Sequence, residues 1–207
     1  MDGELFIGES GVDSAIGAMR VRWTGTRPIL MHNERLANPA DPISRKLAEY
    51  HSLKAAQKKL PENMEAVARL EFEGGLYFDE ETGPYIPAHN ILACIRDAAK
   101  ITRRGTDVKR GVIVLGDAPL IYDGPRTIDE MWADGRFRDT RSVRLSGRVQ
   151  RTRPMFPRGW QIEAEIRFSE EIIDRESLIS VQREAGEYVG VGDYRERFGR
   201  FRVEVIG

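Results

Sequence analysis

The chain has 207 residues, of which 41% are hydrophobic and 31% are charged, and its 32 Lys and Arg residues nearly balance its 33 Asp and Glu residues. This composition is that of a globular domain and excludes a disordered or fibrous chain. No apolar run reaches the roughly 18 residues of a membrane span, and the acidic residues 1–4 do not form a signal or transit peptide. The single cysteine, Cys94, excludes an internal disulfide, so we expect a reducing, cytoplasmic setting.

The first half of the chain begins with a predicted strand and continues into a helix. Residues 18–24 alternate between apolar and polar side chains, as in a strand with one buried face. Asp41 precedes a proline, which is typical of a helix start, and the apolar spacing that follows predicts a helix that Pro61 ends. We expect this helical insertion to span residues 34–64, and we predict a further strand over residues 65–73.

A second helix is predicted after Pro87, and its basic end at Arg103 and Arg104 before Gly105 is typical of a helix terminus. Residues 112–115 then read as a short buried strand. Thr127 and Glu130 have the spacing of a capping box, which predicts a brief helix. Alternation predicts a strand with two distinct faces over residues 143–150, within a protruding hairpin, and another over residues 160–168.

The remaining segments complete a fold prediction. Asp174 is a suitable N-cap for another helix, a glycine-rich connector follows it, and residues 201–205 form the last predicted strand. Without its insertions, this order predicts an α+β domain with a ferredoxin-like (RRM-like) βαββαβ core, in which two helices cover one face of a sheet. We expect a single domain over residues 1–207 with an Arg-rich insertion at residues 120–159.

Positive charge is concentrated in one segment. Residues 136–158 hold one aspartate and eight arginines, namely Arg136, Arg138, Arg141, Arg144, Arg148, Arg151, Arg153 and Arg158. The planar guanidinium group can bind phosphate and can stack on bases, so this segment is a candidate nucleic-acid contact. Alternatively, these arginines form a solvent-exposed strand face that binds no ligand.

Three motifs occur in the order found in a known protein family. Residues 83–96 resemble the Ile-Pro-Gly-Ser-Ser-Leu-Lys-Gly-x-x-Arg signature of the RAMP superfamily, the repeat-associated proteins of CRISPR effector complexes. Residues 79–83 are similar to its acidic turn, and residues 190–200 are similar to its C-terminal glycine-rich loop. The signature's Gly-Ser-Ser is Ala-His-Asn here, its Lys is Leu92, and the glycine-rich loop has two additional residues. The closest likeness is to the backbone subunits.

The resemblance implies a function. Backbone subunits of the family stack side by side along a guide RNA, and a thumb hairpin of one subunit reaches over the strand. The resemblance implies single-stranded RNA or DNA as partner, with RNA favoured, together with a homo-oligomer and other effector-complex subunits as further partners. We expect neither a cofactor nor a metal, because one cysteine and three scattered histidines do not suit a zinc cluster. Membership of a CRISPR complex and a stand-alone or mobile-element origin both stay open. The residues expected at the nucleic acid are His32, Asn33, His89, Asn90, Arg96, Arg141, Arg144, Arg148, Arg151, Arg153, Gly190, Gly192, Arg195, Arg197 and Arg200.

Other interpretations of these residues remain. The glycine-rich loop also has the composition of a simple turn after a helix. Arg96 is equally suited to an ion pair with a surface carboxylate. Some family members cleave RNA with an aspartate after the first strand, which makes Asp41 the candidate residue of a metal-dependent endoribonuclease of the same fold, although its position favours a helix cap. A purely structural assembly protein is the third hypothesis. The three tryptophans have the spacing of core residues.

Overall fold

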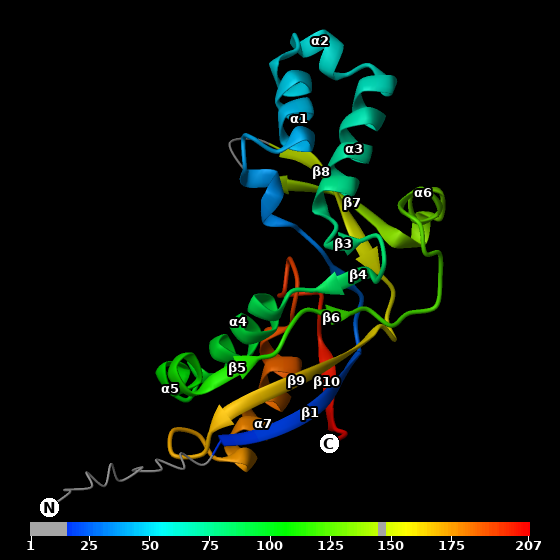
Figure 1. The fold of residues 1–207 in the computed structure, drawn as a ribbon. Helices are drawn as coiled ribbons and strands as arrows, with labels where there is room; N and C mark the ends of the chain where they lie inside the picture. Colours follow the sequence, from blue (N-terminus) through cyan, green and yellow to red (C-terminus); the bar gives the residue numbers. More distant parts are fainter. Residues whose placement is uncertain (1–15, 145–147) are drawn as a thin grey trace, which may run out of the picture.

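The computed structural model of the chain describes residues 16–144 and 148–207, without the side chains of Arg144 and Arg148. These residues form a mixed α+β fold with antiparallel sheets (Figure 1). Within the described part of the chain, no helix has the length and apolarity needed to cross a membrane.

The main sheet has four strands: β1 (Ile16–Gly25), β5 (Val112–Val114), β9 (Gln161–Ser169) and β10 (Phe201–Val205). Their spatial order is β10-β1-β9-β5, and each neighbouring pair is antiparallel. Met19, Val21 and Trp23 of β1 are buried, as their alternation predicts. On the opposite face, Arg20 and Arg22 each form an ion pair with Glu163 of β9.

Two helices cover the buried face of this sheet. They are α4 (Ala88–Ala99) and α7 (Arg175–Glu184), which contact each other and the strands beside them. Asp174 caps α7 as predicted, because its carboxylate accepts a hydrogen bond of 2.8 Å from the Ser177 amide. Ile91, Ile95 and Leu178 place the apolar faces of both helices in one core with the sheet. A π-helical turn, η3 (Ala185–Val189), follows α7.

The helical insertion is larger than its sequence pattern predicts. It consists of the 3-10 turn η1 (Glu34–Ala37) and three helices, α1 (Pro42–Ser52), α2 (Ala55–Lys58) and α3 (Pro61–Gly75). The predicted strand over residues 65–73 is wrong, since this segment belongs to α3. Pro61 begins that helix, where its missing N–H costs no hydrogen bond. The insertion therefore continues to residue 75.

The structure contains a hairpin with a short helix before it, but the single strand predicted over residues 143–150 is wrong: the ends of this range belong to two different strands, and residues 145–147 lie outside the described part of the chain. β7 (Arg138–Arg144) and β8 (Arg148–Phe156) pair in antiparallel register, and β8 also pairs with β2 (Ile29–Leu30). The capping box at Thr127 and Glu130 opens α6 (Ile128–Ala133). A third small sheet contains β3 (Phe78–Asp79), β4 (Gly83–Ile86) and β6 (Ala118–Pro119). Through the pairing of β2 with β8, the Arg-rich insertion is hydrogen-bonded to the segment that follows β1.

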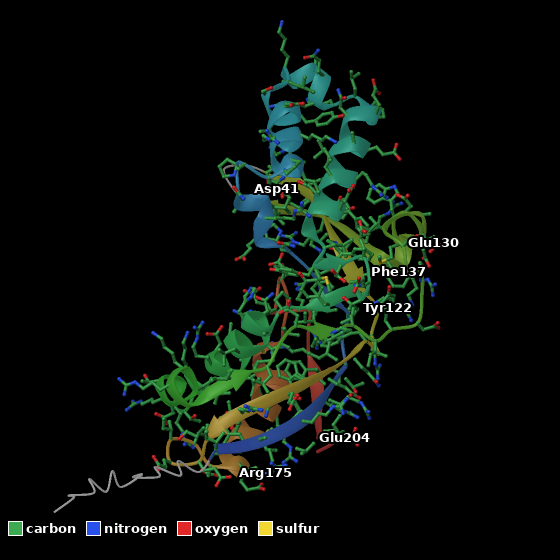
Figure 2. The ribbon with its side chains drawn as sticks, in the orientation of Figure 1. Asp41, Tyr122, Glu130, Phe137, Arg175 and Glu204 are labelled. Atoms are coloured by element: carbon green, nitrogen blue, oxygen red, sulfur yellow. The ribbon has the colours of Figure 1, made fainter. Side chains whose placement is uncertain are left out.

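The molecule is elongated. In Figure 1 the helices α1 to α3 lie at one end with the hairpin below them, and the main sheet with α4 and α7 lies at the other end. The orange segment between α7 and β10 rises from the main sheet to the middle of the molecule. Tyr122 and Phe137, labelled in Figure 2, belong to an aromatic cluster with Phe156 that joins the hairpin to the core. Trp23 and Trp160 are buried in the core as predicted.

Candidate nucleic-acid interface

A small pocket of about 130 Å³ brings together segments that are far apart in the sequence. It is formed by the loop after β2, the segment after α3, the end of β4, the first turn of α4 and the loop before β10. Three of the predicted nucleic-acid residues line it together, although they lie about 60 to 100 positions apart in the chain: His32, Asn90 and Gly192. Met31, Tyr77, Ile86 and Asp193 complete the wall.

The glycine loop, residues 190–200, reaches this pocket because its glycines adopt left-handed backbone angles. Gly190 and Gly192 have φ values of +82° and +88°, which side chains rarely tolerate. A Cβ on Gly192 would clash with the carbonyl oxygen of Leu30, so only glycine lets the loop pass this close to β2. The Gly190 amide donates to the Ala185 carbonyl at 2.7 Å, and the Asp193 amide donates to Leu30 at 2.8 Å. Both amides are therefore engaged within the protein.

The glycine loop lies against the base of the Arg-rich hairpin. Arg153 of β8 forms an ion pair with Asp193 of the loop. The guanidinium carbon of Arg141 on β7 lies 4.6 Å from the ring centre of Phe198 and 5.4 Å from that of Tyr194. Cation–π contacts of this kind stabilise the arrangement. The two features that carry the predicted positive groups are thus on the same side of the molecule and in contact.

Several arginines of the hairpin segment have carboxylate partners inside the protein. Arg141 bonds to Asp139 at 2.6 Å, and Arg136 bonds to Asp134 at 2.7 Å. Arg151 forms an ion pair with Glu71 of α3, a buried carboxylate that also accepts the amide of Thr152 at 2.8 Å. The ion pair between Arg151 and Glu71 therefore holds the hairpin against the helical insertion. With Arg153, four arginines of this segment pair with carboxylates, two of them with local aspartates and two with carboxylates from distant parts of the chain.

The other arginines of the segment differ in their surroundings. Arg138 stacks over Trp132, with its guanidinium carbon 4.2 Å from the ring centre, and Trp132 is half-buried. Arg158 is exposed in the turn before β9. Arg144 and Arg148 end the two strands of the hairpin, and their side chains lie outside the described residues.

The start of α4 already has an anionic partner. The Ala88 amide donates to the carboxylate of Asp117 at 2.8 Å, so this end of the helix is capped by the protein itself. His89 is exposed beside it, and Asn90 is half-buried at the pocket. Asn33 is occupied differently, because its side chain donates to the Leu76 carbonyl at 2.8 Å and caps η1. Asn33 therefore shapes the loop that carries His32.

A second group of predicted arginines surrounds the last turn of α4. Arg195 of the glycine loop pairs with Asp97 at 3.0 Å, and Arg96 lies 4.0 Å from the same carboxylate. Burial raises the pKa of Asp97, but hydrogen bonds from Lys100 and Arg195 outweigh it and hold this pKa below its usual range. Buried Cys94 has its pKa raised to about 12, so it is an unreactive thiol.

The two remaining predicted arginines lie at the end of the glycine loop. Arg200 is half-buried, and within the described chain its Nη1 atom is buried without a hydrogen-bond partner. Arg197 is exposed, and its carbonyl oxygen accepts a hydrogen bond of 3.5 Å from Arg27.

Asp41 lies in the helical insertion, at the start of α1 (Figure 2). Its carboxylate accepts the Ile43 amide at 2.8 Å and pairs with Arg35 at 2.8 Å. Partial burial raises the pKa of Asp41, but these bonds and that of the Ser44 amide outweigh it and lower the pKa overall. Asp41 is therefore a helix cap in this structure. Across residues 16–144 and 148–207, no three His, Cys, Asp or Glu side chains gather in a way that could hold a metal ion.

Two aromatic residues at this site are absent from the sequence prediction. Tyr77 lines the pocket, and its hydroxyl group donates to the His32 carbonyl at 3.4 Å. Tyr194 is 39% exposed in the glycine loop and has a φ of +50°, which is unusual for a bulky side chain. Tyr194 could have been predicted as a site residue, because it is an aromatic residue among the glycines and arginines of a predicted binding loop. The sequence contains no comparable indication for Tyr77.

The sequence matches no protein-family model and no curated protein. The interpretation of the site therefore depends on its own geometry.

Proposed function

We propose that the chain is a RAMP-type protein that binds single-stranded nucleic acid, with RNA as the favoured ligand, across the surface between the Arg-rich hairpin and the glycine loop. The observation that carries the proposal is the pocket where His32, Asn90 and Gly192 meet beside the base of the hairpin. Three separate sequence segments supply these residues, and all three residues belong to the set that the family resemblance implies.

The arrangement of the main sheet supports the family part of the proposal. The chain runs from β1 through α4 to β5, and from β9 through α7 to β10, with spatial order β10-β1-β9-β5. This order is compatible with a ferredoxin-like βαββαβ core. In that interpretation α1 to α3 are an insertion after β1, and β7 with β8 corresponds to the thumb hairpin of the family.

The chemistry of the pocket suits a sugar–phosphate backbone. The imidazole of His32 and the amide of Asn90 can donate hydrogen bonds to phosphate or ribose oxygens. Asp193 would repel a phosphate, but its ion pair with Arg153 offsets that charge. The polar groups of this lining suit the oxygens of a phosphate or a sugar, and contacts of that kind carry no base readout. Exposed Tyr194 offers a nearby surface for stacking.

A binding assay with pocket variants tests this proposal. We expect His32→Ala combined with Asn90→Ala to lower the affinity for a fluorescent single-stranded RNA at least ten-fold at low salt, measured by anisotropy. The matched control is His51→Ala, which removes an exposed histidine from α1 outside the pocket. The same strand made of DNA tests the preference for RNA. Equal affinities of the double variant, the control and the unchanged chain would remove the pocket from the proposal.

The proposal includes self-association, because backbone-type subunits cover a long strand by repetition. We expect the protein to form side-by-side oligomers on a long single strand, either as a filament or together with other effector-complex subunits. Light scattering of the full chain with and without a single-stranded RNA of several site lengths measures the assembly. A complex whose mass corresponds to one protein per strand at saturation would contradict this part.

A further inference from the structure

A second pocket, of about 370 Å³, lies where α4 ends and the next helix, α5 (Gly105–Gly111), begins. Figure 1 shows α5 beside α4, at the end of the molecule that is remote from the β7–β8 hairpin. The lining of the pocket contains four cationic side chains, two small residues and no carboxylate; its members are Arg96, Lys100, Arg103, Gly105, Thr106 and Lys109.

The positive charge of this pocket is only partly compensated. Lys100 bonds to Asp97 at 2.7 Å, but the same carboxylate also holds Arg195 and leaves Arg96 at 4.0 Å. In the described part of the chain, neither Arg103 nor Lys109 has a carboxylate within 4.0 Å. Like charges gathered in one pocket repel each other, and a bound anion would relieve this repulsion.

Arg96 provides an independent sign of an absent ligand. Its Nε atom is buried and has no hydrogen-bond partner among the described residues. Buried donors are nearly always paired in folded proteins, so an unpaired one calls for an explanation such as a bound ion. Arg96 lines the pocket, and a change of its side-chain rotamer would let an anion bound there accept this hydrogen bond.

The backbone at Arg103 is a third observation. The Arg103 amide donates to the Lys100 carbonyl, and the Arg104 amide donates to the Ala99 carbonyl at 2.8 Å. This pattern is the Schellman helix end, whose left-handed residue is usually glycine, yet Arg103 occupies that position with a φ of +63°. The expected role of Gly105 as the helix-ending glycine is thus wrong: it begins α5, where a Cβ would press against Lys100. An arginine kept in a strained conformation suggests that its side chain is needed at this place.

We propose that this pocket binds a phosphate-bearing anion at a site separate from the pocket of His32 and Asn90. The cations of α4, of the turn and of α5 would neutralise the phosphate oxygens, and the Thr106 hydroxyl would donate a hydrogen bond. The phosphate can belong to a free polyphosphate compound or to the backbone of a nucleic-acid strand. The site does not depend on the proposed function, because its charges and its unpaired donor are properties of this pocket alone.

Calorimetric titration of the full chain with inorganic tripolyphosphate at low salt tests the site. We expect Lys109→Glu to weaken binding at least ten-fold. Arg110→Glu is the matched control, since it makes the same charge change on the same exposed helix but lies outside the lining, and we expect less than a two-fold effect. Equal losses in both variants, or no measurable binding by the unchanged protein, would overturn the proposal.

Arg103→Gly separates binding from folding. Glycine relieves the strained backbone, so we expect this variant to unfold at a higher temperature than the unchanged chain while its tripolyphosphate affinity falls at least five-fold. Unchanged affinity in Arg103→Gly would contradict a role for Arg103. The affinity of Lys109→Glu for single-stranded RNA then identifies the source of the phosphate: a parallel loss supports a strand backbone, and an unchanged value supports a free phosphate compound.

Discussion

Two glycines, Gly199 in the glycine loop and Gly83 at the start of β4, show how backbone geometry limits substitution. Gly199 has a φ of +69°, and a Cβ at this position would clash with the carbonyl oxygen of Val191. Gly83 has a similar φ of +78°, but a Cβ there would have no neighbour within 4 Å. The two positions therefore share the cost of a left-handed backbone, and only Gly199 adds a steric cost.

We predict that Gly199→Ala lowers the free energy of unfolding by about 2–4 kcal/mol, because backbone strain and a clash with main-chain atoms add together. Gly83→Ala is the matched control and should lose about 1 kcal/mol from strain alone. Urea denaturation followed by circular dichroism measures both variants. Similar losses in the two variants would show that residue 199 can move away from Val191 within the loop.

Asp41 allows a prediction that depends on pH. Asp41→Ala removes both the helix cap and the Arg35 partner, and we expect a loss of about 1 kcal/mol at pH 7, while Asp41→Asn keeps a capping oxygen and loses less. The pKa of Asp41 is lowered in the folded state, so its contribution is complete above the ordinary aspartate value of about 4 and decreases as the pH falls through the lower, folded-state pKa.

The advantage of the unchanged chain over Asp41→Asn should therefore shrink as the pH falls below about 4, which urea titrations at several pH values can measure. A difference that stays constant over this range would show that Asp41 is not held by charged partners in the folded protein.

At the level of elements, the sequence predicts best where one face of a strand or helix is buried and the other is solvated. The alternation in β1 and β9 and the capping residues of α6 and α7 all led to correct elements. The prediction failed over residues 65–73, which belong to α3. Val67 and Leu70 are three positions apart, which is the apolar spacing of a helix and not the two-residue alternation of a strand.

The site was less predictable than the strands. The approach of His32, Asn90 and Gly192 depends on how distant loops meet, and only a resemblance between motifs suggested it. The neutralisation of Arg151 and Arg153 could not be predicted, since their partners Glu71 and Asp193 lie 80 and 40 residues away in the chain. Charge counted along a segment therefore overestimates the charge that a strand of nucleic acid would meet.

The junction between α3 and β8 provides a prediction at the scale of elements. Glu71 is 6% exposed and accepts hydrogen bonds from Arg151 and from the Thr152 amide. Glu71→Ala leaves a buried amide without a partner, and we expect the free energy of unfolding to fall by about 2–3 kcal/mol.

Glu73→Ala is the control for that substitution, because Glu73 belongs to the same helix but forms only a partly exposed ion pair with Arg69, worth about 0.5 kcal/mol. Denaturation curves of the two variants compare them directly. Equal effects would mean that Glu71 does not hold the hairpin to the helical insertion.

For the whole molecule, the distribution of charge matters more than its sum. The formal net charge is −1, and two of the eight arginines of the hairpin segment, Arg151 and Arg153, form ion pairs with carboxylates of other segments. If the proposed function is correct, the arginines without such partners should dominate the dependence of strand affinity on salt. Each phosphate neutralised on a single strand contributes a slope of about −0.7 to log affinity against log salt.

We therefore predict different salt slopes for two double variants. Arg153→Gln with Asp193→Asn removes a complete ion pair, so the slope should stay within about 0.3 of the unchanged chain, since no phosphate contact is lost. Arg144→Gln with Arg148→Gln removes the two charges nearest the tip of the hairpin and should make the slope shallower by about 1.4. Anisotropy of a labelled single strand between low and physiological salt measures both slopes. A shallower slope for the first variant would mean that Arg153 leaves Asp193 to contact a phosphate, and an unchanged slope for the second would exclude the hairpin tip from binding.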